Sequence, residues 1–330
     1  MNKNLKTKFE DFVNENISNA NKEFTNKIYD LFIENGYGEY KLNFNNNRLK
    51  LIDATIKFEN NNGEKLCYFD EKIPKIENYF DNLIMKDVYL YFSNFNINSL
   101  KEEISHETVH VQEMYDKLIF EELNSIKKTS THNIINYTIQ KMRNKNKYFD
   151  VFLDIIYRTT DNELNCKLNE IYFYLKKYKS EDKKFLKEKL KKSEVYNTIE
   201  EIENLDFKKL SFGLLNSTGV INLSNCINEF NKLYFEELTN LKSRNIKTYN
   251  FLKYKVYTNN DVIKYFEYWE EIIKNKFEKF YNKLDSIIEK VITDIHFNEN
   301  NSNYLNVNTD DNLIERIREV LKNSSEPKDL

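Results

Sequence analysis

Apolar and polar residues recur with two different periods along this chain, and the change of period divides it into three predicted parts. Apolar side chains lie at helical spacing over residues 3–34. Between residues 40 and 93 they instead tend to alternate with polar ones, as in strands. From Ser99 to the C-terminus helical spacing returns. The pattern predicts a helix, a small sheet and a long helical region, in that order.

The middle part contains the strands. They are predicted over 40–44, 49–58, 65–69 and 87–93, and Asn60-Asn61-Asn62-Gly63 is typical of a hairpin turn. A short helix is predicted from Ile76 to Ile84, just before the last strand.

The third part is predicted as helix after helix. Ser99 followed by Glu102 forms a capping-box pattern at the start of the first helix, and no glycine or proline interrupts it before Lys127. Later helices are predicted over 226–243, 260–296 and 310–322, with an Asn-rich loop over 298–308. The fold class is therefore α+β and mostly helical, with a small mixed sheet beside the helix that starts near Ser99. Composition alone suggests a core at 1–178 and a helical region at 179–330, which could also form one domain.

Composition and charge disfavour several classes of function. The 330 residues carry a net charge of −3, which does not suggest binding to nucleic acid. Three widely spaced cysteines favour reduced thiols in the cytoplasm, and no segment has the length and hydrophobicity of a membrane span or signal peptide. Only five glycines are present, and they form no phosphate-binding loop or nucleophile elbow, which disfavours common cofactor enzymes and serine hydrolases.

The helix that starts near Ser99 carries the candidate chemistry. Its residues His106-Glu107-Thr108-Val109-His110 form an H-E-x-x-H pattern. In a helix, the spacing of four places both imidazoles on one face, where they can bind Zn²⁺ together, with Glu107 beside them. The alternative is an ordinary amphipathic helix that happens to contain two histidines.

A sheet that leads into an H-E-x-x-H helix resembles the zincin metallopeptidases, including the phage-type peptidases among them. The resemblance implies that His106 and His110 bind zinc, that Glu107 is the catalytic general base, and that the substrate is a peptide or protein. It also implies that the preceding strand, Val88 to Ser93, offers its edge to an extended substrate. Metzincins would need Gly and His where this chain has Glu113 and Asp116, so the similarity is to gluzincins.

A third ligand is then expected from a downstream helix, and Glu163 is the first candidate. Small Cys166, three residues on, would let the two helices approach each other. The alternatives are that Glu163 caps its own helix in a capping box with Thr160, and that Glu170 is the ligand instead.

We therefore expect a zinc-dependent endopeptidase with Zn²⁺ as its cofactor, located in the cytoplasm, or in a host cytoplasm or virion if phage-encoded. Its C-terminal helices could bind a protein partner. The rival hypothesis is a non-catalytic structural or interaction protein, for example a virion-associated one, with a zincin-like or helical-bundle fold.

Overall fold

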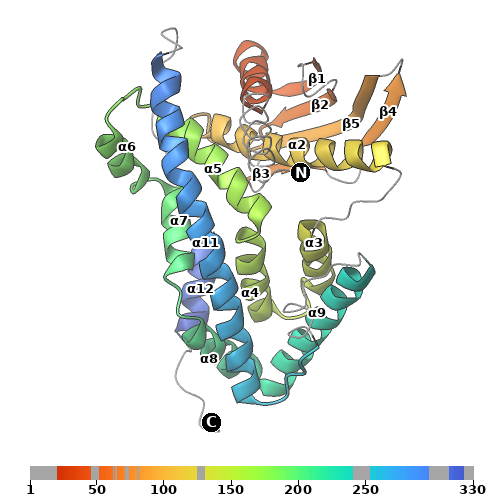
Figure 1. The fold of residues 1–330 in the computed structure, drawn as a ribbon, viewed down its shortest axis with the longest axis vertical. Helices are drawn as coiled ribbons and strands as arrows, with labels where there is room; N and C mark the ends of the chain where they lie inside the picture. The colour runs from red at the N-terminus through yellow and green to blue at the C-terminus, as the bar shows by residue number, and fades with distance from the viewer. Residues whose placement is uncertain are drawn as a thin grey trace, which may run out of the picture. The chain divides into compact units, whose positions relative to one another are not determined.

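The computed structural model describes residues 21–45, 52–61, 63, 65–70, 74–79, 82–124, 131–240, 253–296 and 312–322 (Figure 1). The chain divides into two compact units that are interleaved along the sequence. Unit 1 contains residues 1–128, 165–186 and 287–308, and unit 2 contains the remaining stretches, 129–164, 187–286 and 309–330. The domain boundary expected near residue 179 stays a prediction.

Unit 1 is built on a five-stranded mixed sheet, which confirms the α+β class. Its strands are β1 (Gly38–Phe44), β2 (Ile52–Glu59), β3 (Leu66–Phe69), β4 (Lys75–Tyr79) and β5 (Asn82–Ser93). The strand order is β1-β2-β5-β3, and β4 also pairs with β5. Only the β2–β5 pair is parallel; the other three pairs are antiparallel. The long strand β5 is therefore the centre of the sheet.

Three expectations about this region are wrong. The segment from Asn60 to Gly63 is not the turn of a hairpin, because in the described sheet β2 and β3 both pair with β5 and not with each other. The helix predicted from Ile76 to Ile84 is a hairpin, in which β4 pairs with the start of β5 and Tyr79 lies opposite Asn82. The strand Val88–Ser93 does not offer a free edge, because β2 pairs with one side of it and β3 pairs with the other side over its last four residues. The edge strand next to β5 is β3.

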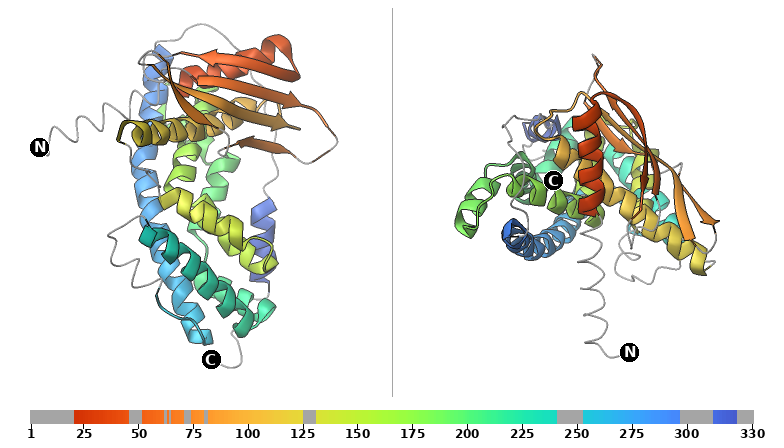
Figure 2. Two further views of the ribbon diagram at one scale, coloured as in Figure 1. Left: turned by 90° about the vertical axis from the view of Figure 1, so that its right-hand side faces the viewer. Right: turned by 90° about the horizontal axis from the view of Figure 1, so that it is seen from above.

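The core of unit 1 lies between one face of the sheet and two helices. Along β2, alternate residues from Ile52 to Phe58 are buried, which places them on one face of the sheet. They belong to one hydrophobic cluster with residues of β5, of the helix over 21–35 and of α2 (Leu100–Asn124). Both helices lie on the same side of the sheet (Figure 2). This packing fixes α2, which carries the H-E-x-x-H pattern, against the sheet.

Helix α2 begins as predicted, but with different contacts at its start. The Ser99 hydroxyl donates to the carboxylate of Glu103 at 2.7 Å. Glu102 instead forms a buried ion pair with Lys177, beyond the end of α5 (Asp161–Lys176). Lys177 also donates to the carbonyl oxygen of Asn98 at 2.6 Å. The segment from Asn165 onward is thereby attached to the first turn of α2.

Helix α5 runs antiparallel to α2. The Asn169 side chain donates to the carbonyl oxygen of Ser105 at 2.9 Å. Asn169 lies about two turns before Lys177, and Ser105 lies about two turns after Asn98. A residue later along α5 therefore meets a residue earlier along α2, and the two helices present several side chains to each other.

Unit 2 is helical throughout its described residues. It contains α3 (Thr131–Met142), α4 (Lys147–Arg158), the first turn of α5, the last turn of α6 (Lys183–Leu190), α7 (Glu194–Glu203), α8 (Phe207–Thr218), α9 (Val220–Asn240), most of α11 (Asn259–His296) and α12 (Asn312–Leu321). The predicted helices over 226–243, 260–296 and 310–322 agree with α9, α11 and α12 within their described residues. The predicted 298–308 loop and residues 3–20 of the first helix lie outside the described residues.

Aromatic residues form much of the core of unit 2, together with aliphatic ones. Phe152 of α4 packs against Phe266 of α11, with ring centroids 4.5 Å apart, and also against Trp269. Helix α8 approaches α12 so closely that a Cβ atom at Gly213 would lie 2.3 Å from the carbonyl oxygen of Val320, so only glycine fits there.

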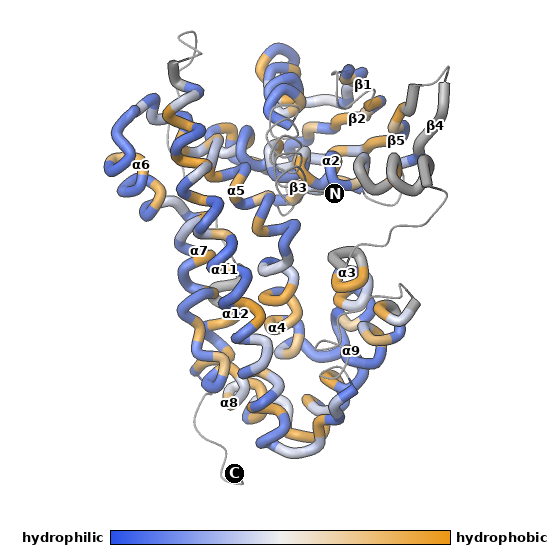
Figure 3. Tube along the Cα trace, in the orientation of Figure 1, coloured by the Kyte–Doolittle hydropathy of each residue, from blue (hydrophilic) through white to orange (hydrophobic). Residues whose placement is uncertain are grey.

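Helix α6 is predominantly hydrophilic (Figure 3). None of the described helices combines the length and the apolar character needed to cross a bilayer.

Candidate metal centre

The two histidines of the H-E-x-x-H pattern lie one turn apart on α2 and face the same way, as predicted. Their Nε2 atoms are 3.2 Å apart, and their ring centroids are 5.0 Å apart. Both rings are mostly buried. The helix alone therefore brings two potential ligand atoms together at one point.

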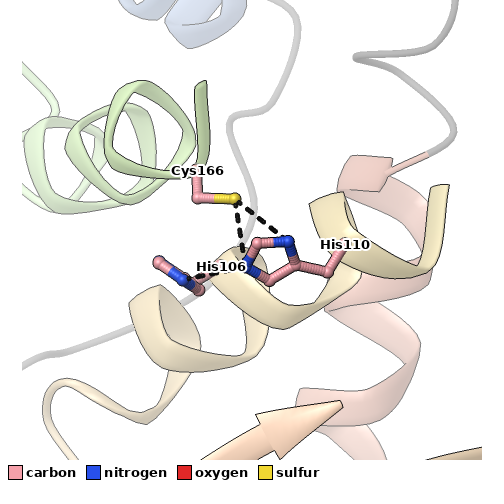
Figure 4. Close-up of side chains that lie close together, drawn as sticks. All are labelled: His106, His110 and Cys166. Atoms are coloured by element: carbon pink, nitrogen blue, oxygen red, sulfur yellow. Dashed lines mark hydrogen bonds between the residues drawn. The ribbon is translucent and has the colours of Figure 1, made fainter. Parts of the chain in front are cut away.

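A third potential ligand comes from α5, and it is Cys166. Its sulfur atom lies 3.6 Å from Nε2 and 3.9 Å from Nδ1 of His110 (Figure 4). Ligand atoms of Cys166, His106 and His110 all lie within 4.8 Å of one another, and all three residues belong to unit 1. The sequence pattern predicts for Cys166 only the role of a small residue that lets the two helices approach each other. The missed signal was chemical, since a thiolate is itself a common zinc ligand.

Two of the separations between these atoms match those in a tetrahedral zinc site. With Zn–N bonds of about 2.0–2.1 Å and Zn–S bonds of about 2.3 Å, two nitrogen ligands lie about 3.3 Å apart and a nitrogen and a sulfur ligand about 3.6 Å apart. The separations of 3.2 Å between the two Nε2 atoms and 3.6 Å between Sγ and Nε2 match these values. Three protein ligands would leave one coordination position for water or substrate.

Glu170 contacts the opposite side of the first imidazole. Its carboxylate forms a short hydrogen bond with Nδ1 of His106, so Nε2 is the nitrogen that faces His110. Lys167 Nζ donates to both carboxylate oxygens of Glu170, at 2.8 and 3.1 Å. Burial alone would raise the pKa of Glu170, but the charge of Lys167 and the bond to His106 outweigh it and lower the pKa to about 2. An ionised carboxylate on the far nitrogen is the usual partner of a zinc-binding histidine.

Glu107, the predicted general base, is buried on the sheet side of α2. Its Oε2 atom accepts a hydrogen bond of 2.8 Å from the backbone N–H of Phe69 in β3. The carboxylate is therefore anchored to the edge strand, one residue after His106 in the sequence. That contact links the sheet to the helix that carries the two imidazoles.

Glu163, the predicted third ligand, is 3% exposed and lies one turn before Cys166 on α5. Its backbone N–H donates to the Thr160 hydroxyl at 3.4 Å, which is the first half of the capping box considered for this residue. The reciprocal bond is replaced, because the Thr160 N–H donates to the Tyr157 carbonyl oxygen at 3.0 Å. Glu163 belongs to unit 2, and its assignment as a ligand stays a prediction.

Comparison of the chain with protein-family models, with curated proteins and with solved structures found no match. The chemistry of this centre therefore has to be argued from its own residues.

Proposed function

We propose that this protein is a zinc-dependent endopeptidase in which His106, His110 and Cys166 bind the ion and Glu107 is the general base. The observation that carries the proposal is the convergence of two Nε2 atoms and one sulfur atom at separations of 3.2 and 3.6 Å. The sequence favoured a ligand set with Glu163 in place of Cys166. The geometry of unit 1 supports Cys166 better.

The charge of the ligand set is compatible with catalysis. Two neutral imidazoles and one thiolate carry a total charge of −1, the same as two imidazoles and one carboxylate. A Zn²⁺ ion in either set would keep a net charge of +1 and one open position, which suits an electrophilic centre. Replacing the expected glutamate by cysteine therefore changes the softness of the site without changing its charge.

The residues around the centre have distinct roles in this proposal. When bound, zinc would polarise the scissile carbonyl group and increase the acidity of a water molecule. Glu107 would accept the proton of that water and deliver it to the leaving amine. The hydrogen bond from the Phe69 N–H supports this role, because it holds the Glu107 carboxylate in one orientation. Glu170 would keep Nε2 of His106 free of its proton and directed at the ion.

An extended peptide is the substrate that the sheet supports best. Within the described part of the chain, β3 pairs with β5 alone. On its other edge the Phe69 N–H is occupied by Glu107, and the outward groups of Cys67 are the ones that could pair with a further strand. The Phe69 N–H points away from β5, since it donates to Glu107. In an antiparallel strand the groups of Cys67 then point the same way. A peptide paired along this edge would run close to the general base.

Metal analysis and peptide cleavage together test the proposal. We expect purified protein to hold about one zinc ion per chain, and we expect His106→Ala and His110→Ala each to abolish stoichiometric binding. A matched control is His296→Ala, which removes a histidine outside the centre. Zinc retained undiminished in both α2 variants would rule out the metal centre.

Cleavage of a peptide library then separates the enzyme from the rival non-catalytic protein. Glu107→Gln should keep zinc but slow cleavage by at least about a hundredfold, because the amide cannot accept a proton from water. Zinc binding without cleavage by the unaltered protein would favour a structural metal in an interaction protein. Cleavage that is equally fast in Glu107→Gln would refute the assigned base.

A further inference from the structure

Lysine side chains gather around one buried aromatic ring in unit 1, away from the metal centre. The Nζ atoms of Lys22, Lys176 and Lys290 lie 5.4, 5.6 and 5.9 Å from the centroid of the Tyr172 ring. Lys101 Nζ lies 5.7 Å from the ring of the next residue, Phe173. These four lysines come from the helix over 21–35, from α2, from α5 and from the end of α11, and we call them the lysine cluster.

Among the described residues, the carboxylate of Asp294 contacts this cluster. Asp294 of α11 forms an ion pair of 2.6 Å with Lys22 and accepts a short hydrogen bond from the Tyr172 hydroxyl. Both side chains of the ion pair are mostly buried, at 17% and 18% exposed. Among the described residues, the four lysines of the cluster counted against Asp294 leave 4 − 1 = 3 positive charges.

The lysines repel one another. The pKa of Lys176 is lowered to about 8, first by burial and then by the charge of Lys22; Asp294 opposes this shift and Lys101 adds to it. Half-buried like charges destabilise the folded protein, and such arrangements are concentrated at binding and catalytic sites. The Tyr172 hydroxyl cannot relieve the repulsion, since it donates its proton to Asp294 and burial raises its pKa.

We propose that the lysine cluster binds a phosphate-type oxyanion, held mainly by Lys22, Lys101 and Lys176. A phosphate group carries close to two negative charges near neutral pH, which would offset most of the surplus positive charge of the cluster. Lysine ammonium groups bind phosphate as point charges and adapt to it through their flexible stems. The ligand class is therefore a phosphate or a compact molecule that carries one.

The site is separate from the metal centre, although the same two helices contribute to both. Lys101 precedes His106 by five residues on α2, and Lys176 follows Cys166 by ten residues on α5. At 1.5 Å per residue these spacings correspond to about 7.5 and 15 Å along the helices. The proposal does not depend on the proposed peptidase activity.

Calorimetric titration with inorganic phosphate and with pyrophosphate at low ionic strength tests the site. We expect saturable binding, and we expect Lys176→Met to weaken it by about tenfold or more, since one charge-assisted contact is lost. Lys101→Met is the second variant, used if circular dichroism shows that Lys176→Met does not fold. Lys184→Met is the matched control, because Lys184 is an exposed lysine on α6 outside the cluster.

The same titration in His110→Ala excludes binding at the metal centre. Unchanged affinity in His110→Ala and in Lys184→Met, together with loss in the cluster variants, would support the site. Absence of saturable binding by the unaltered protein would overturn the proposal. So would loss of binding in His110→Ala, or equal weakening in Lys184→Met and the cluster variants.

Discussion

The sulfur atom of Cys166 lies 3.6 Å from Nε2 of His110, although 56 positions separate the two residues in the sequence. This contact turns a pair of histidines into a group of three ligand atoms. There are thus two candidates for the third ligand. The geometry favours Cys166, the sequence pattern favours Glu163, and an experiment can distinguish them.

Replacing Cys166 should remove the metal. We expect Cys166→Ala to lower zinc to well below one ion per chain, because two imidazoles alone bind zinc weakly compared with three ligands. Atomic absorption on dialysed protein measures the content, and Cys226→Ala, on α9, is the matched control. Zinc lost in Glu163→Gln but retained in Cys166→Ala would show that the sequence-based ligand is the correct one.

Glu170 should influence affinity without being a ligand. We expect Glu170→Gln to weaken zinc binding by about 10–100-fold, as for other carboxylates that orient a zinc-binding histidine. Competition with a fluorescent chelator gives the affinity, and Glu188→Gln on the surface of α6 is the control. An unchanged affinity would mean that the contact between Glu170 and Nδ1 of His106 does not serve the metal.

The long helix α11 should stabilise the folded protein through its packing and take no part in zinc binding. Phe277 is 1% exposed, so Phe277→Glu places a charge where the side chain has no access to water. We expect the free energy of unfolding to fall by about 3 kcal/mol or more, with zinc content unchanged below the melting temperature. Thermal denaturation of this variant beside the exposed-site variant Glu278→Gln measures the effect. An unaltered melting temperature would contradict the burial of Phe277.

The lysine cluster should make stability depend on pH in the alkaline range. The pKa of Lys176 is about 8 in the folded protein against an ordinary value of 10.5. Between these two values the unfolded chain holds a proton that the folded protein has released, so the contribution of Lys176 to stability rises as the pH rises.

Lys176→Met should therefore lack this rise. Melting temperatures of both proteins from pH 7 to pH 10 give the difference directly, and the variant should be the more stable of the two at pH 7. A difference that stays constant over this range would show that Lys176 keeps its ordinary pKa.

The parts of this fold that depend on local pattern were predictable. The alternation over 49–58 predicted the strand β2, and the spacing of His106 and His110 placed both rings on one side of a helix. The error at β4 also has a local cause. Apolar residues at Ile76, Tyr79, Phe80, Leu83 and Ile84 have helical spacing, and pairing with β5 prevails over that pattern.

The role of Cys166 was not predictable in the same way. It depends on how α2 and α5 cross, and nothing in the residues near Cys166 specifies which turn of α2 it meets. The same holds for Glu170, which the sequence offered as a possible ligand and the crossing places on the opposite side of the His106 ring.

The geometry of the candidate metal centre depends on how α2 and α5 are aligned along each other. Cys166 meets His110, Asn169 meets Ser105, and Lys177 meets Asn98, in one continuous series. A slide of one helical turn, about 5.4 Å, would separate every one of these pairs together. In the proposed centre, His106, His110 and Cys166 could therefore bind one ion only while the two helices keep this alignment. Without the ion, the contacts of Asn169 with Ser105 and of Lys177 with Asn98 would still hold the two helices in this alignment.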